Sequence, residues 1–340
     1  MDPRFVDACP AWDAALGRVA MELAEGAANS RSAVPGDRVQ AKLLEQGAPY
    51  VWPRTWTVSG GARLERELGS RLSSWLAAQP NEGPRRCGGA VVRGPNGRIG
   101  AAVVLVEALA ELSPIPANVR LGSWVEVQAQ LLVPHAGAKV IALGPRGRPQ
   151  PLPTALDGGR VRARFAADRE GPWLLQVVAD MEGGPRQVLE ALLIAGTGPR
   201  SAEVGTAPGE NSTSSDAAGL LSMLNAARES ERLRPLAARL ELDELAADQA
   251  EALRAAQRLA HDLGNGDPES RVQAAGLTQT RIGENVAHAD SLARAHRALW
   301  SSPSHRSNML DDRFDSIGIG VAHDADGSVW VCELFARLAR

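Results

Sequence analysis

Two short stretches near the C-terminus decide the fold of this 340-residue chain: Gly283-Glu284-Asn285-Val286-Ala287 and, twelve residues on, residues 299–310, which read LWSSPSHRSNML. Both stretches concentrate polar groups capable of chemistry in a region otherwise rich in Ala and Leu. Five of the six histidines lie between His261 and His323, and the first 134 residues contain none. Any histidine-dependent chemistry is therefore expected in the C-terminal third of the chain.

Further motifs flank these stretches in a fixed order. Upstream lies Leu224-Asn225 with Arg228, and downstream lie two predicted strands, residues 317–321 (IGIGV) and residues 329–335 (VWVCELF). The ordered set resembles the bacterial CAP domains, also called SCP-like, whose superfamily includes cysteine-rich secretory proteins, venom allergens and plant pathogenesis-related proteins. A lone GEN is weak evidence, since Gly209-Glu210-Asn211 repeats it in a linker. The resemblance covers residues 217–340 and implies an α-β-α sandwich, in which helices cover both faces of a small antiparallel sheet.

The resemblance also implies a cleft lined by two His and two Glu, which holds a divalent metal in some members. The resemblance places GEN in a turn before the following helix. Glu284 matches the glutamate of that turn, and it can ligate a metal, accept a hydrogen bond from an imidazole, or cap the helix. His305 matches the histidine of the S-P-x-H-R motif. His296, within the stretch AHRAL, and His261 match positions where some members carry a histidine. The expected cleft-lining residues are Glu284, Asn285, His296, His305, Glu333 and His261.

Two departures leave this set incomplete. The first family helix usually carries a cleft histidine, but Ala252 stands at that position, and Ala can neither bind a metal nor transfer a proton. Glu333 replaces the glutamine usual in the final strand. We therefore assign no metal ligand and no cofactor, with Zn²⁺ as a weak alternative.

Two functions remain open for the C-terminal region. The favoured one is a binding module for a ligand or partner, which can be lipid, glycan, peptide or protein. The alternative is a metal-assisted hydrolase of peptide or cell-wall substrates, with Glu284, His296 and His305 as catalytic candidates acting on a water. The sequence has no H-E-x-x-H, G-x-S-x-G, P-loop or C-x-x-C motif that would favour another enzyme class.

Composition limits the partners and the compartment. The net charge of −3 provides no basic field for nucleic acid or anionic membrane. No apolar run approaches the ~20 residues that span a bilayer. The opening residues MDPRFVDACP lack the features of a signal peptide. Because the resemblance implies export, we expect a secreted or periplasmic protein whose signal peptide is absent from this sequence. Of three cysteines, Cys9 and Cys87 can pair, whereas Cys332 is expected to be buried and free.

Residues 1–112 are predicted to form an α+β unit. Apolar residues at helical spacing predict one helix around residues 12–23 and another over residues 64–78, with a loop rich in Gly, Ser and Pro between them. A hairpin follows, with Asn96-Gly97 in its turn. This order of elements repeats that of the C-terminal region, which suggests a degenerate CAP-like copy made by duplication. The alternative is two unrelated units that share common turns.

Residues 117–196 differ in pattern. Apolar and polar residues alternate from residue 125 to 131, and further short strands follow at 139–143, 160–166, 172–179 and 187–195. They predict a central β-sandwich, immunoglobulin-like, with Trp173 in its core. Residues 197–216, rich in Gly, Ser, Thr and Pro, are expected to be a flexible linker. The fold class is thus α+β multidomain.

Overall fold

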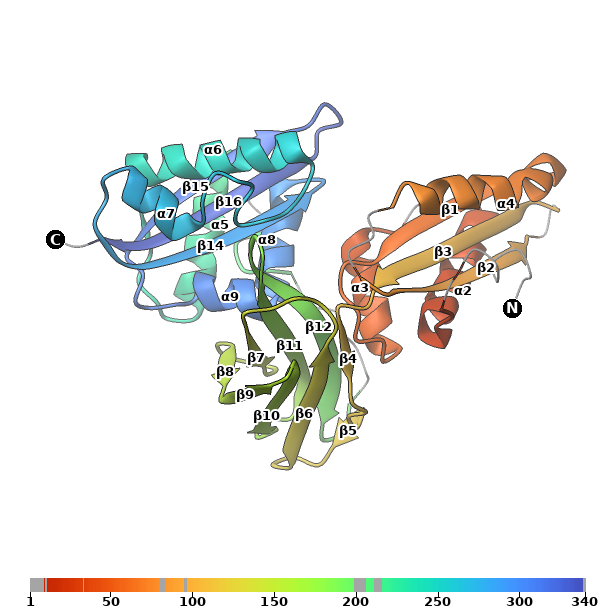
Figure 1. Ribbon diagram of the computed structural model, residues 1–340, viewed down its shortest axis with the longest axis horizontal. Coiled ribbons are helices and arrows are strands. Elements are labelled where there is room, and N and C mark those ends of the chain that lie inside the picture. Colours follow the sequence, from red (N-terminus) through yellow and green to blue (C-terminus); the bar gives the residue numbers. More distant parts are fainter. Residues whose placement is uncertain are drawn as a thin grey trace. The chain divides into compact units, whose positions relative to one another are not determined.

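The computed structural model describes residues 9, 11–32, 34–79, 83–94, 97–198, 206–210 and 216–338 (Figure 1). The chain divides into two compact units. The first comprises residues 1–140, 152–179 and 187–203, and the second comprises residues 141–151, 180–186 and 204–340. No helix among the described residues is both long and apolar enough to cross a membrane.

The N-terminal part of the first unit is a small three-layered α+β structure. Its elements are α2 (Ala14–Ala28), α3 (Gly36–Glu45), β1 (Arg54–Gly60), α4 (Ala62–Ala77), β2 (Arg85–Arg93) and β3 (Ile99–Glu107). The sheet order is β1-β3-β2, with both pairs antiparallel. Strand β3 is buried along its whole length because its even-numbered residues pack against α2 and its odd-numbered residues against α4.

Two details of this part differ from expectation. The region predicted as a loop contains α3 and β1. The sequence RTWTVSG of β1 is rich in β-branched and aromatic residues, which favour a pleated strand over a loop. Met21, predicted on the buried face of the first helix, is exposed, whereas Leu16, Val19 and Leu23 are buried. Asn96 of the predicted hairpin turn lies outside the described residues. Cys9 and Cys87 form a disulfide, with Cα atoms 5.9 Å apart.

The central region consists of two sheets. Its strands are β4 (Ala110–Leu112), β5 (Asn118–Val119), β6 (Trp124–Leu131), β7 (Gly137–Leu143), β8 (Gln150–Leu152), β9 (Thr154–Asp157), β10 (Arg160–Ala166), β11 (Gly171–Met181) and β12 (Gly184–Ala195). One sheet has the order β4-β6-β10-β9 and the other β5-β12-β11-β7-β8. Phe165 of the first sheet contacts Trp173 of the second, with ring centroids 5.1 Å apart. Trp173 is fully buried, as predicted from the sequence.

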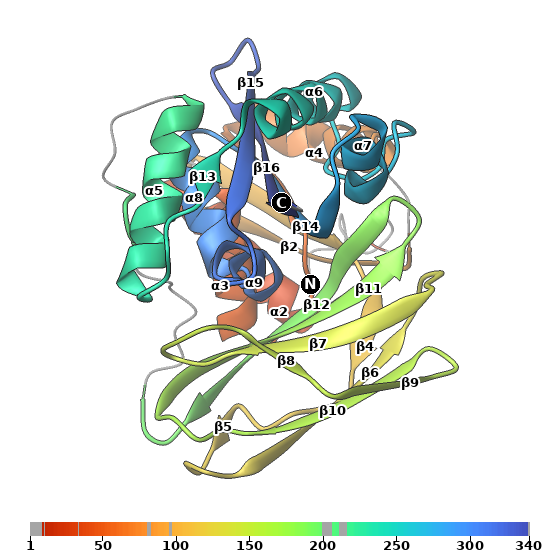
Figure 2. The same cartoon turned by 90° about the vertical axis from the view of Figure 1, so that its left-hand side faces the viewer.

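The C-terminal region is the predicted α-β-α sandwich. Its elements are α5 (Ala217–Ser230), β13 (Ala237–Ala238), α6 (Leu240–Ala256), α7 (Pro268–Ala274), β14 (Gln279–Ala289), α8 (Leu292–Ser301), α9 (Pro303–Met309), β15 (Ser316–His323) and β16 (Val329–Leu338). The sheet order is β13-β15-β16-β14. Figure 2 shows α5 and α8 on one side of this sheet and α6 and α7 on the other. Strand β16 supplies alternate residues to the two apolar cores, Val331 and Phe335 to one, Trp330 and Leu334 to the other.

The glycines of the IGIGV motif have a packing role. A Cβ on Gly318 would lie 2.1 Å from the backbone carbonyl of Leu242, and one on Gly320 would lie 2.0 Å from the carbonyl oxygen of Ala246. Helix α6 therefore crosses β15 at a distance that only glycine permits.

Two further sequence expectations are corrected here. The GEN residues 283–285 do not form a turn before the helix. They lie within strand β14, where Glu284 pairs with Leu334 and Asn285 with Glu333. Within the expected flexible linker, residues 206–210 are packed against the core of this region. Ala207 is buried in the core beside α5 and α8, and Glu210 pairs with Arg297.

Candidate functional site

Strand β14 places the two polar residues of the GEN sequence on opposite faces of the sheet. Successive side chains of a strand alternate between faces. Glu284 accordingly lies with Cys332 and the α6–α7 region, whereas Asn285 lies with Glu333 and α9. Because β14 is the edge strand of the described sheet, groups from both faces can meet around it.

Glu284 is buried and fully engaged. Its side chain is 1% exposed and pairs with the guanidinium of Arg271. The Nδ1–H of His261 donates to Oε1 of Glu284 at 2.8 Å, and the thiol of Cys332 donates to Oε2 at 3.3 Å. Both carboxylate oxygens are therefore held by protein donors, as buried charges require.

Arg271 of α7 ties Glu284 to the loop that carries His261. Its Nη1 donates to Oε1 of Gln249 at 2.7 Å and to the carbonyl of His261 at 2.9 Å. It also donates to the carbonyl of Gly266 at 3.1 Å. One buried guanidinium thus fixes helix α6, the α6–α7 loop and strand β14 relative to one another, which the planar fork of arginine favours.

His261 lies in the loop after α6, which ends at Ala256, and not on the helix itself. Gln257, in the left-handed conformation with φ 49°, terminates the helix. The backbone N–H of His261 donates to the carbonyl of Gly183, which belongs to the same compact unit, at 3.0 Å. With a side chain 15% exposed, His261 keeps part of its ring open to solvent while Glu284 fixes its orientation.

A second network lies on the other face of the sheet. Nδ2 of Asn285 donates to Oε2 of Glu333 at 2.9 Å and to the carbonyl of His305 at 3.2 Å. Asn308 donates to Oδ1 of Asn285 at 3.0 Å and to the carbonyl of Glu284 at 3.2 Å. The Asn of the GEN sequence therefore holds helix α9, and with it His305, against the sheet.

Burial changes the protonation of both ends of this network. Burial raises the pKa of Glu333 to about 7, although the hydrogen bond from Asn285 opposes the shift. Its Oε1 has no hydrogen-bond partner among the described residues. Burial lowers the pKa of His305 to about 3, and the neighbouring His261 lowers it further. His305 is consequently a neutral imidazole at neutral pH.

His296, the third catalytic candidate, lies elsewhere. It is fully buried on α8, and its Nε2–H donates to the carbonyl of Pro208 at 2.9 Å. Its Nδ1 has no hydrogen-bond partner in the part of the chain that the structure describes, and burial lowers its pKa. The structure thus brings Glu284, His261 and His305 to the region of β14, while it packs His296 against residues 206–210.

The sequence interpretation missed Arg271, Gln249 and Asn308 as parts of the site. A signal existed for Arg271, because a glutamate expected in a buried position needs a cationic partner. Arg306 has a structural role, since its guanidinium stacks on Trp300 at 3.6 Å and approaches Glu231 at 3.4 Å. Among the described residues, no group of three or more His, Cys, Asp or Glu side chains is arranged to hold a metal ion.

The C-terminal region combines an α-β-α sandwich, a GEN glutamate on an edge strand and an S-P-x-H-R-x-N helix, and in these features it resembles the CAP class of domain. The family model of the cysteine-rich secretory protein family, CAP, matches residues 221–334. These residues therefore form a CAP domain of that family, which accounts for about a third of the chain. No curated protein matches the chain.

Several solved structures are similar to the chain. An outer surface protein of Borrelia burgdorferi is 23% identical, covers 35% of this chain and 90% of its own, and has a TM-score of 0.34. An extracellular protein of Bacillus anthracis that contains an SCP domain is 15% identical over 67% of this chain and 88% of its own, with a TM-score of 0.33. A cysteine-rich secretory protein of Staphylococcus aureus is 13% identical over 66% of this chain and 87% of its own, with a TM-score of 0.30.

Proposed function

We propose that this protein is exported and that its CAP domain serves as a binding module for a ligand or partner, without hydrolytic activity. The engagement of Glu284 carries the proposal. A carboxylate that is 1% exposed and paired with Arg271 cannot act as a general base or metal ligand unless that ion pair opens. The domain uses the GEN glutamate to orient His261 and to stabilise the fold.

The histidines support the same function. His296 is hydrogen-bonded to Pro208, and His288 stacks on Trp330. The imidazoles that remain near Glu284 are His261, which contacts it, and the neighbouring His305. Two imidazoles supply fewer ligands than the three protein ligands of a typical catalytic zinc site. A neutral imidazole that is partly accessible can instead donate or accept one hydrogen bond with a bound polar group.

An imidazole titration detects such binding directly. We expect a ligand of the CAP domain to shift the NMR resonances of the His261 and His305 rings and to leave those of the exposed His323 unchanged. Suitable probes are muropeptides, lipid vesicles, oligosaccharides and short peptides. Perturbation of His323 alone, or of neither cleft histidine by any probe class, would contradict a binding role for this region.

Activity assays test the alternative. On peptide and cell-wall substrates, the wild-type protein and the Glu284→Gln variant should show equal, background rates of hydrolysis. A rate in the wild-type protein that falls in Glu284→Gln, with the variant still folded, would establish the hydrolase function and refute the proposal.

We further propose that residues 1–112 are a degenerate CAP-like copy and that residues 117–196 are an immunoglobulin-like sandwich. The order β1-β3-β2, with α4 between β1 and β2, parallels the order β14-β16-β15, with α8 and α9 between β14 and β15. A Cβ on Gly88 of β2 would lie 2.0 Å from the backbone N of Gly17 on α2, as Gly318 of β15 approaches α6. These shared features support a duplication in which the N-terminal copy lost every histidine.

A further inference from the structure

The outer face of the sheet β4-β6-β10-β9 carries an unusual combination of exposed groups. In β6, Val125, Val127 and Ala129 point into the sandwich and are buried. Trp124, on the opposite face, is 69% exposed, and Leu121 in the preceding turn is 56% exposed. Large apolar side chains exposed to this extent are a common mark of a binding surface.

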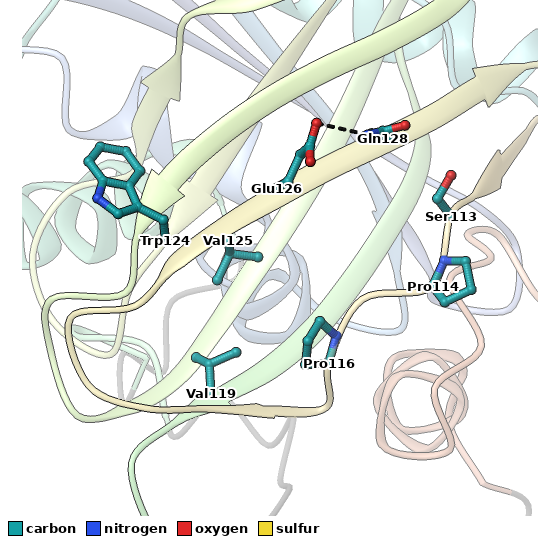
Figure 3. A pocket seen from close by; sticks show the side chains of 8 residues that line it. All are labelled: Ser113, Pro114, Pro116, Val119, Trp124, Val125, Glu126 and Gln128. Atoms are coloured by element: carbon teal, nitrogen blue, oxygen red, sulfur yellow. Dashed lines mark hydrogen bonds between the residues drawn. The ribbon is translucent and has the colours of Figure 1, made fainter.

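A cavity of about 340 Å³ lies beside Trp124, between β6 and the segment that connects β4 to β5 (Figure 3). Its volume lies at the lower end of the range for small-ligand sites. The amide of Gln128 donates to the carboxylate of Glu126 at 2.8 Å, so both planar groups are held in place at the cavity wall. The lining residues are Ser113, Pro114, Pro116, Val119, Trp124, Val125, Glu126 and Gln128.

A row of arginines runs next to the cavity. Arg160, Arg162 and Arg164 of β10 are exposed, and they pair in register with Gln130, Gln128 and Glu126 of β6. Alternate residues of a strand are about 6.8 Å apart, so the backbone positions of the three arginines repeat at that interval along one face. The guanidinium of Arg164 lies 5.2 Å from the centroid of the Trp124 ring.

The charges on this face leave a local cationic excess. Three carboxylates share this face, Glu111, Glu126 and Asp157, but Glu111 is paired with Arg86 of β2. Arg160, Arg162 and Arg164 therefore stand against two remaining carboxylates, which gives 3 − 2 = +1 on a chain of net charge −3. Within the described residues, no ion pair joins these three guanidinium groups to a carboxylate. They are therefore available to an anionic ligand.

We propose that this face binds an acidic polysaccharide. A sugar ring stacks on Trp124 and places its hydroxyl groups against Gln128 and Glu126, while its carboxylate, sulfate or phosphate groups bind the arginine row. The carboxylate of Glu126 favours a glycan, because it accepts hydrogen bonds from the hydroxyl groups that a sugar presents around its ring. The cavity lining is mixed, with Trp124 and Pro116 beside Glu126 and Gln128, which suits the apolar ring faces and the hydroxyl groups of a sugar. The site is independent of the CAP domain and of the function proposed for it.

Affinity electrophoresis of the full chain tests the proposal with three acidic polymers, polygalacturonate, hyaluronate and heparin. We expect retardation by at least one of them, weakened by added salt, and none by neutral dextran. The double variant Arg162→Gln/Arg164→Gln should weaken the apparent affinity about tenfold or more. Arg66→Gln, which removes one exposed arginine from α4, should have no effect.

Variants of Trp124 separate stacking from charge. Trp124→Ala should weaken binding by up to about tenfold, and Trp124→Tyr should keep most of it. Retardation by none of the acidic polymers would overturn the proposal, and so would an affinity unchanged in the double arginine variant. Equal retardation by dextran would refute the acidic ligand. Tighter binding to single-stranded DNA or to phosphatidylglycerol vesicles than to any polysaccharide would assign the face to a nucleic acid or a membrane instead.

Discussion

At the scale of single residues, the CAP domain is organised by the alternation of β14. Glu284 on one face organises the α6–α7 loop through Arg271 and His261, and Asn285 on the other organises α9 through Asn308 and the carbonyl of His305. Two adjacent residues thereby position both histidines from opposite sides of one strand. The GEN sequence therefore connects both the α6–α7 loop and helix α9 to the sheet.

Removing one partner of the Glu284–Arg271 pair should strongly destabilise the folded protein. Arg271→Met leaves Glu284 buried without its cation, so we expect a loss of about 3–5 kcal/mol in the free energy of unfolding. The double variant Arg271→Met/Glu284→Gln should recover most of this loss, because no buried charge remains. Urea denaturation measures both. Arg254→Met, which removes the exposed partner of Glu251, is the control and should change stability little. An equal loss of stability in Arg271→Met and Arg254→Met would contradict the role of the buried pair.

Glu333 should make stability depend on pH. Its pKa of about 7 in the folded protein exceeds the value of 4.5 expected when unfolded, so the folded state binds the proton more tightly. Its contribution is complete below pH 4.5 and is lost as the pH rises to about 7. Glu333→Gln should therefore gain stability relative to wild type over that window, by up to about 3 kcal/mol.

Glu190 of β12 also has a pKa raised to about 7 by burial, so Glu190→Gln serves as a matched comparison. At each pH, the free energy of unfolding of the variant is subtracted from that of the wild-type protein. The histidines are present in both proteins, so their contribution cancels and that of the carboxylate remains. If that difference for Glu333→Gln were flat from pH 4.5 to 7, the protonation of Glu333 would not be coupled to folding.

The contribution of His305 to stability depends on pH in the opposite direction. Its folded pKa of about 3 lies below the usual 6.5, so its contribution is complete above pH 6.5 and is lost as the pH falls toward 3. We expect NMR titration to find the His305 ring neutral at pH 5. Protonation of this ring near pH 6.5 would show that it is not desolvated.

At the scale of elements, α6 lies so close to β15 that no side chain fits at Gly318 or Gly320. Gly318→Ala and Gly320→Ala would force Cβ atoms into the backbone of α6, and we expect each to destabilise the domain by several kcal/mol or to prevent folding. Gly69→Ala is the control. A Cβ there meets no atom within 4 Å, and alanine favours the helix α4, so stability should rise by about 0.5–1 kcal/mol. Thermal unfolding distinguishes the two outcomes.

Periodicity alone predicted the faces of the main helices and strands. Leu64, Leu68 and Leu72 repeat at helical spacing and are buried, and residues 125–131 alternate as β6 does. The same periodicity also predicts where the side chain of His296 lies. Leu292, Ala295, His296 and Leu299 share the spacing of one buried face of α8, which places the histidine in the core and not in a cleft.

Other features required tertiary information. The resemblance led us to expect GEN in a turn, but Gly283, Glu284 and Asn285 pair with β16 as part of a continuous strand. Such pairing depends on residues about 50 positions away, which no local pattern shows. The pairing of Glu284 with Arg271 joins residues 13 apart on separate elements, and no local pattern fixes such a contact. The buried position of Glu333 follows from its partner Asn285, 48 residues away.

At the scale of the whole molecule, the cysteines divide by location. Cys9 and Cys87 are bonded in the N-terminal part, and Cys332 is buried and free in the CAP domain. Titration of thiols in the unfolded, unreduced protein should find one thiol per chain, as expected of an exported protein in an oxidising compartment. Three thiols would show that the disulfide does not form and would weaken the case for export.

The central claim is that the CAP domain binds a ligand or partner and lacks a catalytic metal. Calorimetric titration of the metal-free full chain with Zn²⁺ tests it most directly, with His305→Ala, His261→Ala and the control His323→Ala measured in parallel. We predict that Zn²⁺ binds no tighter than micromolar and with similar affinity to the wild-type protein and to all three variants. Stoichiometric binding at nanomolar affinity, lost in His305→Ala and His261→Ala but kept in His323→Ala, would contradict the account and restore the metal-assisted hydrolase.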